Sequence, residues 1–300
     1  MSTQPTLEKS ESRFVPPGQQ RTWTSTTGRP PSVSTVVRTT LLIAGALATI
    51  APVVWAAMSS FKTQEELAQT PPTIFPNDPT VDNYTTGLQA FDFTHYLTNS
   101  LIVTVSATLL TLVINSMAAY ALAKYNFRGR TLLFMITLAT IMIPLQVILL
   151  PVYQMVASLG MTNSLLGLII PPAATPTGVF LLRQYMLTLP DEMIEAARID
   201  GAGEWQIFWR IILPLSRPAL AVVAIFSVIW RWNDFLWPLI VAQDESKQTL
   251  PVAIARFASQ QAIPFNQILA VSMVTIVPIV IIFLILQRQI IAGLAQGAIK

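Results

Sequence analysis

The sequence predicts an all-α membrane protein in which six transmembrane helices hold a cytoplasmic helical hairpin. Of the 300 residues, 53% are apolar and 11% are charged, and the mean hydropathy is +0.57, which is unlike an ordinary soluble domain. The apolar residues gather in six runs, each close to the length that a helix needs to cross about 30 Å of hydrocarbon. These runs are residues 39–58, 101–122, 132–152, 165–182, 219–240 and 268–286.

The first 38 residues are rich in Pro, Ser and Thr and have almost no apolar clustering. This composition predicts a disordered tail over 1–38, followed by a membrane domain over 39–300. A cleaved secretory signal peptide is the alternative interpretation of the first apolar run. That run begins only near Leu41 and is long for a signal peptide, so we expect an uncleaved span.

Lys and Arg residues alternate between the loops. Fourteen lie in the tail, in the 123–131 and 183–218 loops and after the last span, whereas the loops on the other side hold three. Such a bias marks the cytoplasmic side of a bilayer. Both termini and the 183–218 loop are therefore predicted to be cytoplasmic.

The 62–98 loop lies on the outer side in this topology and carries several Pro, Asp and Glu residues. A docking surface for an outside partner and a plain tether are both open, and we favour the docking surface. Prolines also interrupt the third and fourth apolar runs, at Pro144, Pro151, Pro171, Pro172 and Pro176. They indicate broken helices beside a cavity, although prolines are also common in membrane helices generally.

The 183–218 loop has the pattern of two short helices joined by a turn. Pro190 suits a first helical position, Gly201 suits a left-handed helix end, and Pro214 is expected to end the second helix. The spacing i, i+3, i+4, i+7 predicts an apolar stripe on that second helix. The stripe consists of Trp205, Phe208, Trp209 and Ile212.

The fifth apolar run contains charged residues. Arg231 and Asp234 stand three residues apart, with Asn233 between them. Charges inside a bilayer are costly and normally face a cavity or a partner. Mutual pairing on one helix face and contact with a substrate are both open. A third possibility is a position at the outer end of the span, in a belt of tryptophans, where the cost falls.

Catalytic and cofactor signatures are missing from the sequence. It has no Cys, a single His (His95), and no phosphate-binding loop, nucleophile elbow or zinc-protease motif. The basic residues are too scattered to bind nucleic acid. We therefore expect no enzyme activity, no metal site and no cofactor bound by this chain.

The hairpin carries a family resemblance. Glu195-Ala196-Ala197, Gly201, Ile211 and Leu213-Pro214 resemble, in type and spacing, the EAA loop of permease subunits of binding-protein-dependent ABC importers. Residues 180–185, 189–192, 197–202 and 232–239 are similar to the maltose-type branch, whose members carry oligosaccharides, polyols and glycerol phosphate. The similarity runs from about residue 39 to the end, and the long tail departs from it.

The resemblance implies a type I ABC importer in a bacterial inner membrane. Its partners would be a second six-span permease subunit, giving a heterodimer, two cytoplasmic ATPase subunits that bind ATP and Mg²⁺, an extracytoplasmic solute-binding protein and membrane lipids. The hairpin would couple to the ATPase, and the polar residues of the fifth run would line the translocation pathway. The implied coupling residues are Glu195, Ala196, Ala197, Asp200, Gly201, Ile211, Leu213 and Pro214, and the implied pathway residues are Arg231, Asn233 and Asp234.

Two rivals come from other classes. One is a secondary transporter driven by an ion gradient, which would need ionisable groups at mid-membrane and internal repeats. The other is a membrane scaffold whose hairpin recruits a soluble protein. Co-purification with an ATPase that substrate-loaded binding protein stimulates separates the importer from both.

Overall fold

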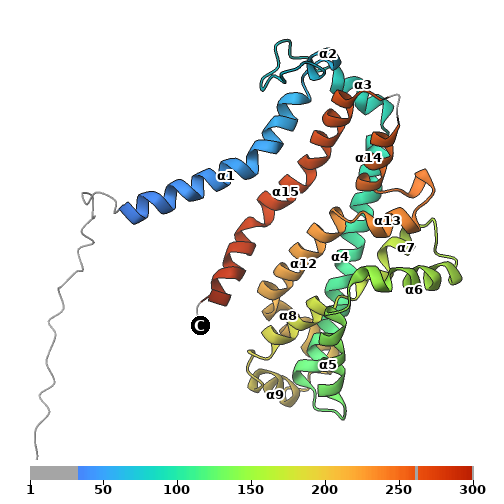
Figure 1. The fold of residues 1–300 in the computed structure, drawn as a ribbon. Coiled ribbons are helices and arrows are strands. Elements are labelled where there is room, and N and C mark those ends of the chain that lie inside the picture. The colour runs from blue at the N-terminus through green and yellow to red at the C-terminus, as the bar shows by residue number, and fades with distance from the viewer. Residues whose placement is uncertain (1–32, 261–262, 299–300) are drawn as a thin grey trace, which may run out of the picture. The chain divides into compact units, whose positions relative to one another are not determined.

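The computed structural model describes residues 33–260 and 263–298, so most of the predicted disordered tail lies outside the described residues. The chain divides into two units, residues 1–51 and 52–300, and the packing below concerns the second. Every regular element in the described ranges is a helix (Figure 1). In chain order they are α1 (Val33–Ser59), α2 (Gln64–Leu67), α3 (Asp82–Ala90), α4 (Phe93–Lys124), α5 (Arg130–Ile141), α6 (Leu145–Ser158), α7 (Leu165–Ile169), η1 (Pro171–Ala173), α8 (Pro176–Met186), α9 (Glu192–Ile199), α10 (Glu204–Ile207), η2 (Phe208–Ile212, a π-helical turn), α11 (Leu213–Leu215), α12 (Arg217–Trp232), α13 (Leu236–Val241), η3 (Glu245–Lys247), α14 (Leu250–Ser259) and α15 (Phe265–Ala298).

Three described helices are continuous and apolar enough to cross a membrane, namely α1, α4 and α15. Three further candidates are bent pairs: α5 with α6 at 106°, α7–η1 with α8 at 44°, and α10–α11 with α12 at 77°. The described residues therefore hold between three and six spans, depending on whether each bent pair is counted as one. The count of six stays a prediction.

The apolar run 132–152 is not one continuous helix, because the chain turns sharply between α5 and α6. Pro144 lies at this break with an extended ψ of 133° and precedes the first residue of α6. Proline has no N–H with which to continue the helical ladder and forces the residue before it out of the helical region. The expectation that prolines break this run and the fourth run is confirmed by the two bends.

The predicted helix over 219–240 is not continuous, because it is interrupted in its second half. α12 ends at Trp232, and α13 begins only at Leu236. Asn233, Asp234 and Phe235 lie in the break between them, which places polar groups where the helical hydrogen bonds stop. A further helix, α14, occupies a segment that the sequence analysis took for a loop.

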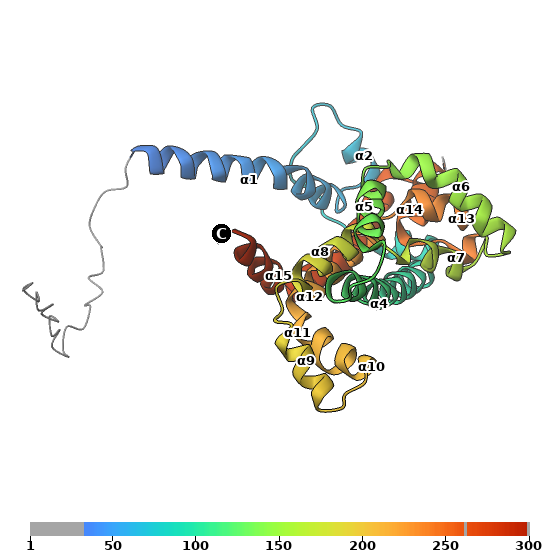
Figure 2. The same ribbon diagram turned by 90° about the horizontal axis from the view of Figure 1, so that it is seen from below.

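α4 is the central helix of the second unit and packs against α8 and α12 (Figures 1 and 2). Its buried side includes a stripe of polar residues at helical spacing, Thr104, Thr108, Thr111 and Asn115. Thr108 shares a hydrogen bond with Ser227 of α12, with 2.9 Å between their oxygens. Small and polar residues allow membrane helices to approach closely and bind one another.

The 62–98 loop is folded rather than a plain tether. The buried Asn83 donates hydrogen bonds to the carbonyls of Ser60 and Lys62, at 2.8 Å each. Asn266, at the start of α15, donates to the Asn83 side chain at 2.7 Å. Figure 1 places α2 and α3 at the end of this unit opposite α9. The loop thus presents a fixed surface, and its docking role stays a prediction.

Candidate functional site

The hairpin consists of α9 and the α10–α11 segment, joined by a tight turn at residues 200–203. Gly201 has a φ of +82°, in the left-handed region, so the predicted glycine helix end is confirmed. The N–H of Ala202 reaches the carbonyl of Ala197 at 2.9 Å, a bond that closes the end of α9. An added Cβ on Gly201 would meet no atom within 4 Å, so the backbone conformation alone demands glycine there.

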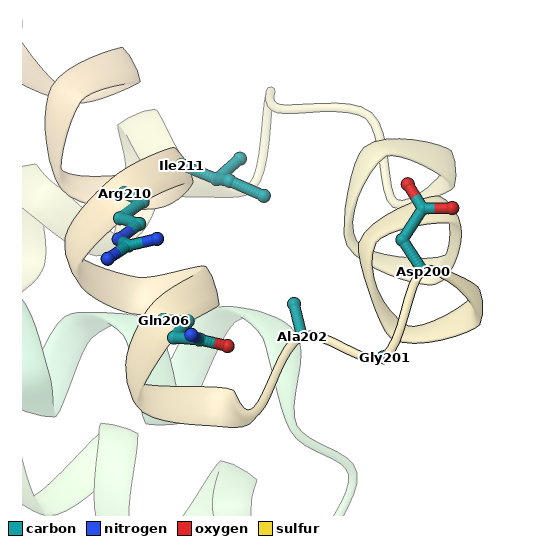
Figure 3. Close-up of a pocket in the computed structure, with 6 residues that line it drawn as sticks. All are labelled: Asp200, Gly201, Ala202, Gln206, Arg210 and Ile211. Carbon is teal, nitrogen blue, oxygen red and sulfur yellow. The ribbon is translucent and has the colours of Figure 1, made fainter.

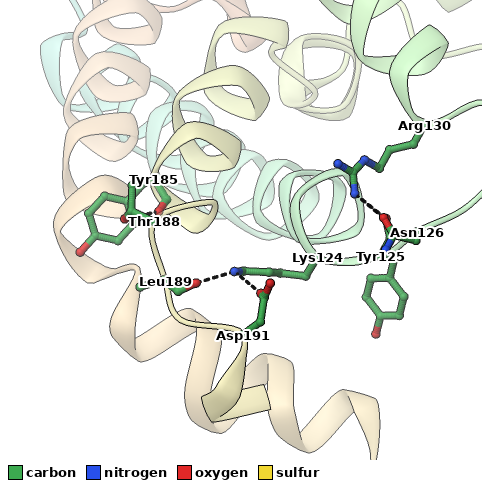
Figure 4. Close-up of polar contacts among 8 residues, drawn as sticks. All are labelled: Lys124, Tyr125, Asn126, Arg130, Tyr185, Thr188, Leu189 and Asp191. Atoms are coloured by element: carbon green, nitrogen blue, oxygen red, sulfur yellow. Dashed lines mark hydrogen bonds and ion pairs between the residues drawn. The ribbon is translucent and has the colours of Figure 1, made fainter. Parts of the chain in front are cut away.

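The predicted start of the hairpin is displaced by two residues. α9 begins at Glu192 with Asp191 as the residue before it, so Pro190 is not the first helical residue. Lys124 explains the difference, because its Nζ donates to the carbonyl of Leu189 at 2.5 Å and to Oδ1 of Asp191 at 2.6 Å (Figure 4). These bonds from the end of α4 hold residues 189–191 in an irregular approach to the helix.

The second helix does not end at Pro214, as predicted, but continues to Leu215. A π-helical turn, η2, occupies the five residues immediately before α11. A proline inside an ordinary helix clashes with the carbonyl four residues earlier and leaves it without a donor. The wider turn before Pro214 accommodates the ring, and the helix ends one residue later, at Leu215, before the 77° bend to α12.

The apolar stripe of the second helix is only partly as predicted. Phe208 and Ile212 are buried, whereas Trp205 and Trp209 are 64% and 46% exposed. Ile207, which the predicted stripe omitted, is fully buried. The buried side packs on the ends of α4 and α8, where it forms one cluster with Ala119, Tyr120, Leu182, Met186 and Ile194. Helical spacing alone fits both the predicted stripe and a neighbouring stripe that includes Ile207, so the spacing could not decide which of the two is buried.

A second group from α4 holds the far side of the hairpin. The hydroxyl of Tyr125 donates a hydrogen bond to Oε2 of Glu204, and Nε of Arg198 donates to Oε1 at 2.8 Å. These bonds from Arg198 and Tyr125 lower the pKa of the Glu204 carboxyl below its ordinary value. Burial and the bond to Glu204 raise the pKa of Tyr125. Sequence reasoning missed Lys124 and Tyr125, although both follow directly after an apolar run.

The predicted coupling residues divide into an exposed and a packed group. Glu195, Ala196, Asp200 and Gly201 are exposed, while Ala197, Ile211, Leu213 and Pro214 are partly buried. Beside the turn lies a hollow of about 330 Å³ (Figure 3). Its lining consists of Asp200, Gly201, Ala202, Gln206, Arg210 and Ile211.

Large apolar side chains are also exposed on the two helices of the hairpin. They are Met193, Ile199, Trp205 and Trp209, and Ile199 is 86% exposed. Exposed large apolar side chains together with charged ones are typical of a protein-binding surface. We call this set, together with Glu195, Ala196, Asp200 and Gly201, the hairpin surface.

Arg231 and Asp234 do not form an ion pair with each other, which was one of the possibilities that the sequence left open. Nη2 of Arg231 donates to Oγ1 of Thr111 at 2.8 Å and to the carbonyl of Pro172 at 2.6 Å. The ion pairs among the described side chains are Lys124–Asp191 and Arg198–Glu204. Because α12 ends at Trp232, Asp234 no longer shares a helix face with Arg231.

Asp234 and Asn233 have local partners instead. Oδ1 of Asp234 accepts the N–H of Trp237 at 3.4 Å, and the exposed Asn233 donates to the carbonyl of Ile229 at 2.8 Å. The pathway role of these residues and of Arg231 stays a prediction. In the described part of the chain, no three His, Cys, Asp or Glu residues come together as metal ligands would.

Comparison with known proteins identifies the family. The model of the family described as "binding-protein-dependent transport system inner membrane component" matches residues 112–296. The arabinooligosaccharides transport system permease protein of Halalkalibacterium halodurans is 39% identical, over 81% of this chain and 88% of its own. The diacetylchitobiose uptake system permease protein of Streptomyces coelicolor is 34% identical, over 87% of each chain. The sn-glycerol-3-phosphate transport system permease protein of Yersinia enterocolitica is 34% identical, over 86% of this chain and 94% of its own.

A solved structure has the same fold. A chain in the crystal structure of a bacterial ABC transporter involved in the import of the acidic polysaccharide alginate aligns with a TM-score of 0.79. The alignment covers 87% of this chain and 99% of that one, at 24% sequence identity. The bent helical pairs described above therefore belong to a known membrane-transporter architecture.

Proposed function

The chain belongs to the family of binding-protein-dependent transport system inner membrane components, and we propose that it is the permease subunit of an ATP-driven ABC importer for a carbohydrate. It is a multi-pass membrane protein, and its role is transport rather than catalysis. The observation that carries the coupling part of the proposal is the hairpin surface. It exposes Glu195 and Ala196 on a hairpin whose other side is packed against α4, α8 and the start of α12.

The ATPase partner is inferred from the chemistry of this surface. Ala196 has no bulk to prevent close approach, Glu195 offers a carboxylate to a basic group, and Ile199 and Trp205 offer apolar area. Exposed aromatic side chains with a few charges are the usual composition of a protein interface. We assign ATP and Mg²⁺ to that partner, with no cofactor on this chain.

A displacement of the hairpin would pass directly to the helices against which it packs. The side facing away from solvent packs Ile194, Ile207 and Phe208 against residues of α4 and α8. Lys124 binds the segment that leads into the hairpin, and Tyr125 binds the start of its second helix, so both segments are held to the end of α4. A closely packed contact transmits displacement instead of absorbing it. When the ATPase closes, α4 and α8 would therefore move with the hairpin.

The substrate class is inferred from the relatives. Their names refer to arabinooligosaccharides, diacetylchitobiose and sn-glycerol-3-phosphate. These are polyhydroxylated solutes, so we propose an oligosaccharide, a polyol or a glycerol-phosphate-like molecule. An extracytoplasmic binding protein would deliver it to the side opposite the hairpin.

The assembly we propose has two permease subunits and two ATPase subunits. α5 exposes apolar side chains along its length, among them Leu132, Met135 and Ile136, and none of its residues is buried. In a bilayer these side chains must be covered by lipid or by another helix. We propose a bacterial inner membrane location, a second and different permease subunit as the partner, and a cytoplasmic position for both termini.

Purification of the chain from its native membrane tests this function. We expect it to co-purify with an ATPase and a second permease, and we expect hydrolysis to rise when binding protein loaded with arabinotriose or diacetylchitobiose is added. Solute uptake that follows an ion gradient without an ATPase would instead identify a secondary transporter. A stable complex with a soluble protein but no uptake would identify a scaffold.

A further inference from the structure

The bend between η1 and α8 leaves backbone groups in the fourth apolar segment without helical partners. The two halves, Leu165–Ala173 and α8, meet at 44°. At such a break, the carbonyls and amides next to the bend cannot complete the helical ladder, and lipid offers them no water. Side chains from neighbouring helices must therefore supply their hydrogen bonds.

Asn115 of α4 supplies partners on one side of the bend. Its Oδ1 accepts the N–H of Thr175 at 3.1 Å, and its Nδ2 donates to Oγ1 of Thr175 at 2.6 Å. The Asn115 side chain is completely buried. One amide thus binds both the backbone and the side chain of the residue that precedes α8.

Arg231 of α12 supplies a partner on the other side. Its Nη2 donates to the carbonyl of Pro172 in η1 and to Oγ1 of Thr111. Thr111 lies one helical turn before Asn115 in α4 and is also completely buried. Two helices therefore hold the bend together, through three hydrogen bonds to residues 172–175 and a fourth that joins Arg231 to Thr111.

Gly178 shows how closely α8 approaches this group. A Cβ built on Gly178 would lie 2.2 Å from Nδ2 of Asn115 and 2.6 Å from Oγ1 of Thr175. Neither atom can retreat without losing its hydrogen bond. Glycine is therefore required here by the approach of α4, and not by its own backbone conformation.

We propose that Asn115 and Arg231 are positioning residues that fix the angle between η1 and α8. α8 leads through residues 187–191 into the hairpin, so the bend is the route along the chain by which displacement of the hairpin reaches the other half of this segment. A broken helix without such bonds would flex at the break and absorb the movement. This inference rests on the proposed function for its purpose, while the fixed angle can be measured independently.

The experiment measures the bend directly. Because the chain has no Cys, Leu166→Cys in α7 and Gln184→Cys in α8 allow two spin labels at exposed sites on either side of it. Pulsed electron paramagnetic resonance on the purified complex gives the distribution of label distances, with and without ATP and vanadate. Thr175→Val removes the hydroxyl to which Asn115 donates, and Thr175→Ser keeps it as the matched control.

In the unmodified complex we expect a narrow distribution that ATP and vanadate leave unchanged, because the angle is fixed. We expect Asn115→Leu and Thr175→Val to broaden the distribution at normal membrane abundance. Thr175→Ser should behave like the unmodified protein, which a general packing defect would not explain. An unchanged width in Thr175→Val overturns the proposal even if Asn115→Leu fails to fold. If the purified complex does not hydrolyse ATP, the proposed function fails, and the widths without nucleotide still decide whether the bend is held.

Discussion

Tyr125, one residue past the end of α4, donates its hydroxyl hydrogen to Glu204, the first residue of α10. Arg198 of α9 binds the other oxygen of the same carboxylate. A single carboxylate therefore joins both helices of the hairpin to the central helix of the protein. This arrangement gives the hairpin a fixed orientation before any partner binds.

Tyr125→Phe should lower the thermal stability of the purified subunit in detergent. The change removes a hydrogen bond to a charged acceptor that is partly exposed, so we expect a loss of about 1 kcal/mol. The measurement is the unfolding midpoint by intrinsic fluorescence. Tyr153→Phe is the control, because the described residues provide no hydrogen-bond partner for its hydroxyl. An equal effect of both changes would show that the bond to Glu204 contributes nothing.

The same carboxylate should make stability depend on pH. The folded state lowers the pKa of Glu204 through Arg198 and Tyr125, so the stabilisation is complete above the ordinary glutamate pKa. It is lost as the pH falls through the lowered folded-state value, because the carboxyl then becomes protonated. We expect the difference in unfolding midpoint between the unmodified protein and Glu204→Gln to shrink between pH 7 and pH values of about 4. A difference that is constant over this range would contradict the assignment.

Gly201→Asp should uncouple the ATPase. A side chain at a φ of +82° costs about 1–2 kcal/mol from the backbone alone, and here it also projects into the hairpin surface. Gly203→Asp is a matched control in the same turn, because Gly203 has an ordinary φ of −73° and nothing within 4 Å of an added Cβ. We expect normal membrane abundance for both and loss of stimulated hydrolysis for Gly201→Asp only. Equal hydrolysis in the two variants would mean that the turn is not strained.

Glu195→Lys should weaken the ATPase complex more than Glu195→Gln does. Reversing the charge would place two positive groups against each other if Glu195 binds a basic residue of the partner, and repulsion at an interface costs more than a lost attraction. The measurement is the amount of ATPase retained on the purified permease as salt increases. If both variants retain as much ATPase as the unmodified chain, Glu195 does not contact the partner.

Arg231→Met should reduce the yield of folded protein, and Asp234→Leu should not restore it. The arginine donates to Pro172 and Thr111, so its loss leaves a partly buried carbonyl without a donor at a cost of about 1–3 kcal/mol. Removing Asp234 returns nothing to these groups, and the two effects should add. Yields are compared by size-exclusion chromatography in detergent. A recovered yield in the double variant would show that Arg231 and Asp234 do pair with each other, contrary to the structure.

The proposed orientation predicts which residues a membrane-impermeant thiol reagent can reach. Thr80→Cys lies in the folded 62–98 loop, and Gly203→Cys lies in the turn of the hairpin. We expect the first to react in intact cells and the second only after the membrane is opened. Reaction of Gly203→Cys in intact cells would invert the topology and exclude a cytoplasmic ATPase partner for the hairpin.

The sequence predicted the features that follow from local rules. Helical spacing and composition located the apolar segments. Gly201 predicted the turn of the hairpin, because few other residues adopt its left-handed backbone conformation. The family motif pointed to the hairpin as the candidate functional element, and this role stays a prediction. These signals are contained within one segment of chain, so no tertiary structure is needed to interpret them.

Features that depend on packing between segments were predicted poorly. The partner of Arg231 is a carbonyl 59 residues away, and no spacing rule connects the two. The buried stripe of the second hairpin helix was rotated, because the choice between Phe208 with Trp209 and Ile207 with Phe208 is made by the ends of α4 and α8. Pro214 was taken for a helix end because the π-helical turn that accommodates it has no recognisable pattern in the sequence.

That π-helical turn gives the spacing of the motif a geometric reason. A helix rotates its side chains by about 100° per residue, so one residue more or less between Gly201 and Pro214 would change which face points outward. The extra residue held in the π-helical turn Phe208–Ile212 therefore determines which face of α10 points outward. It sets the direction of the outward face of α10, to which the proposed ATPase would bind, independently of the direction of α12.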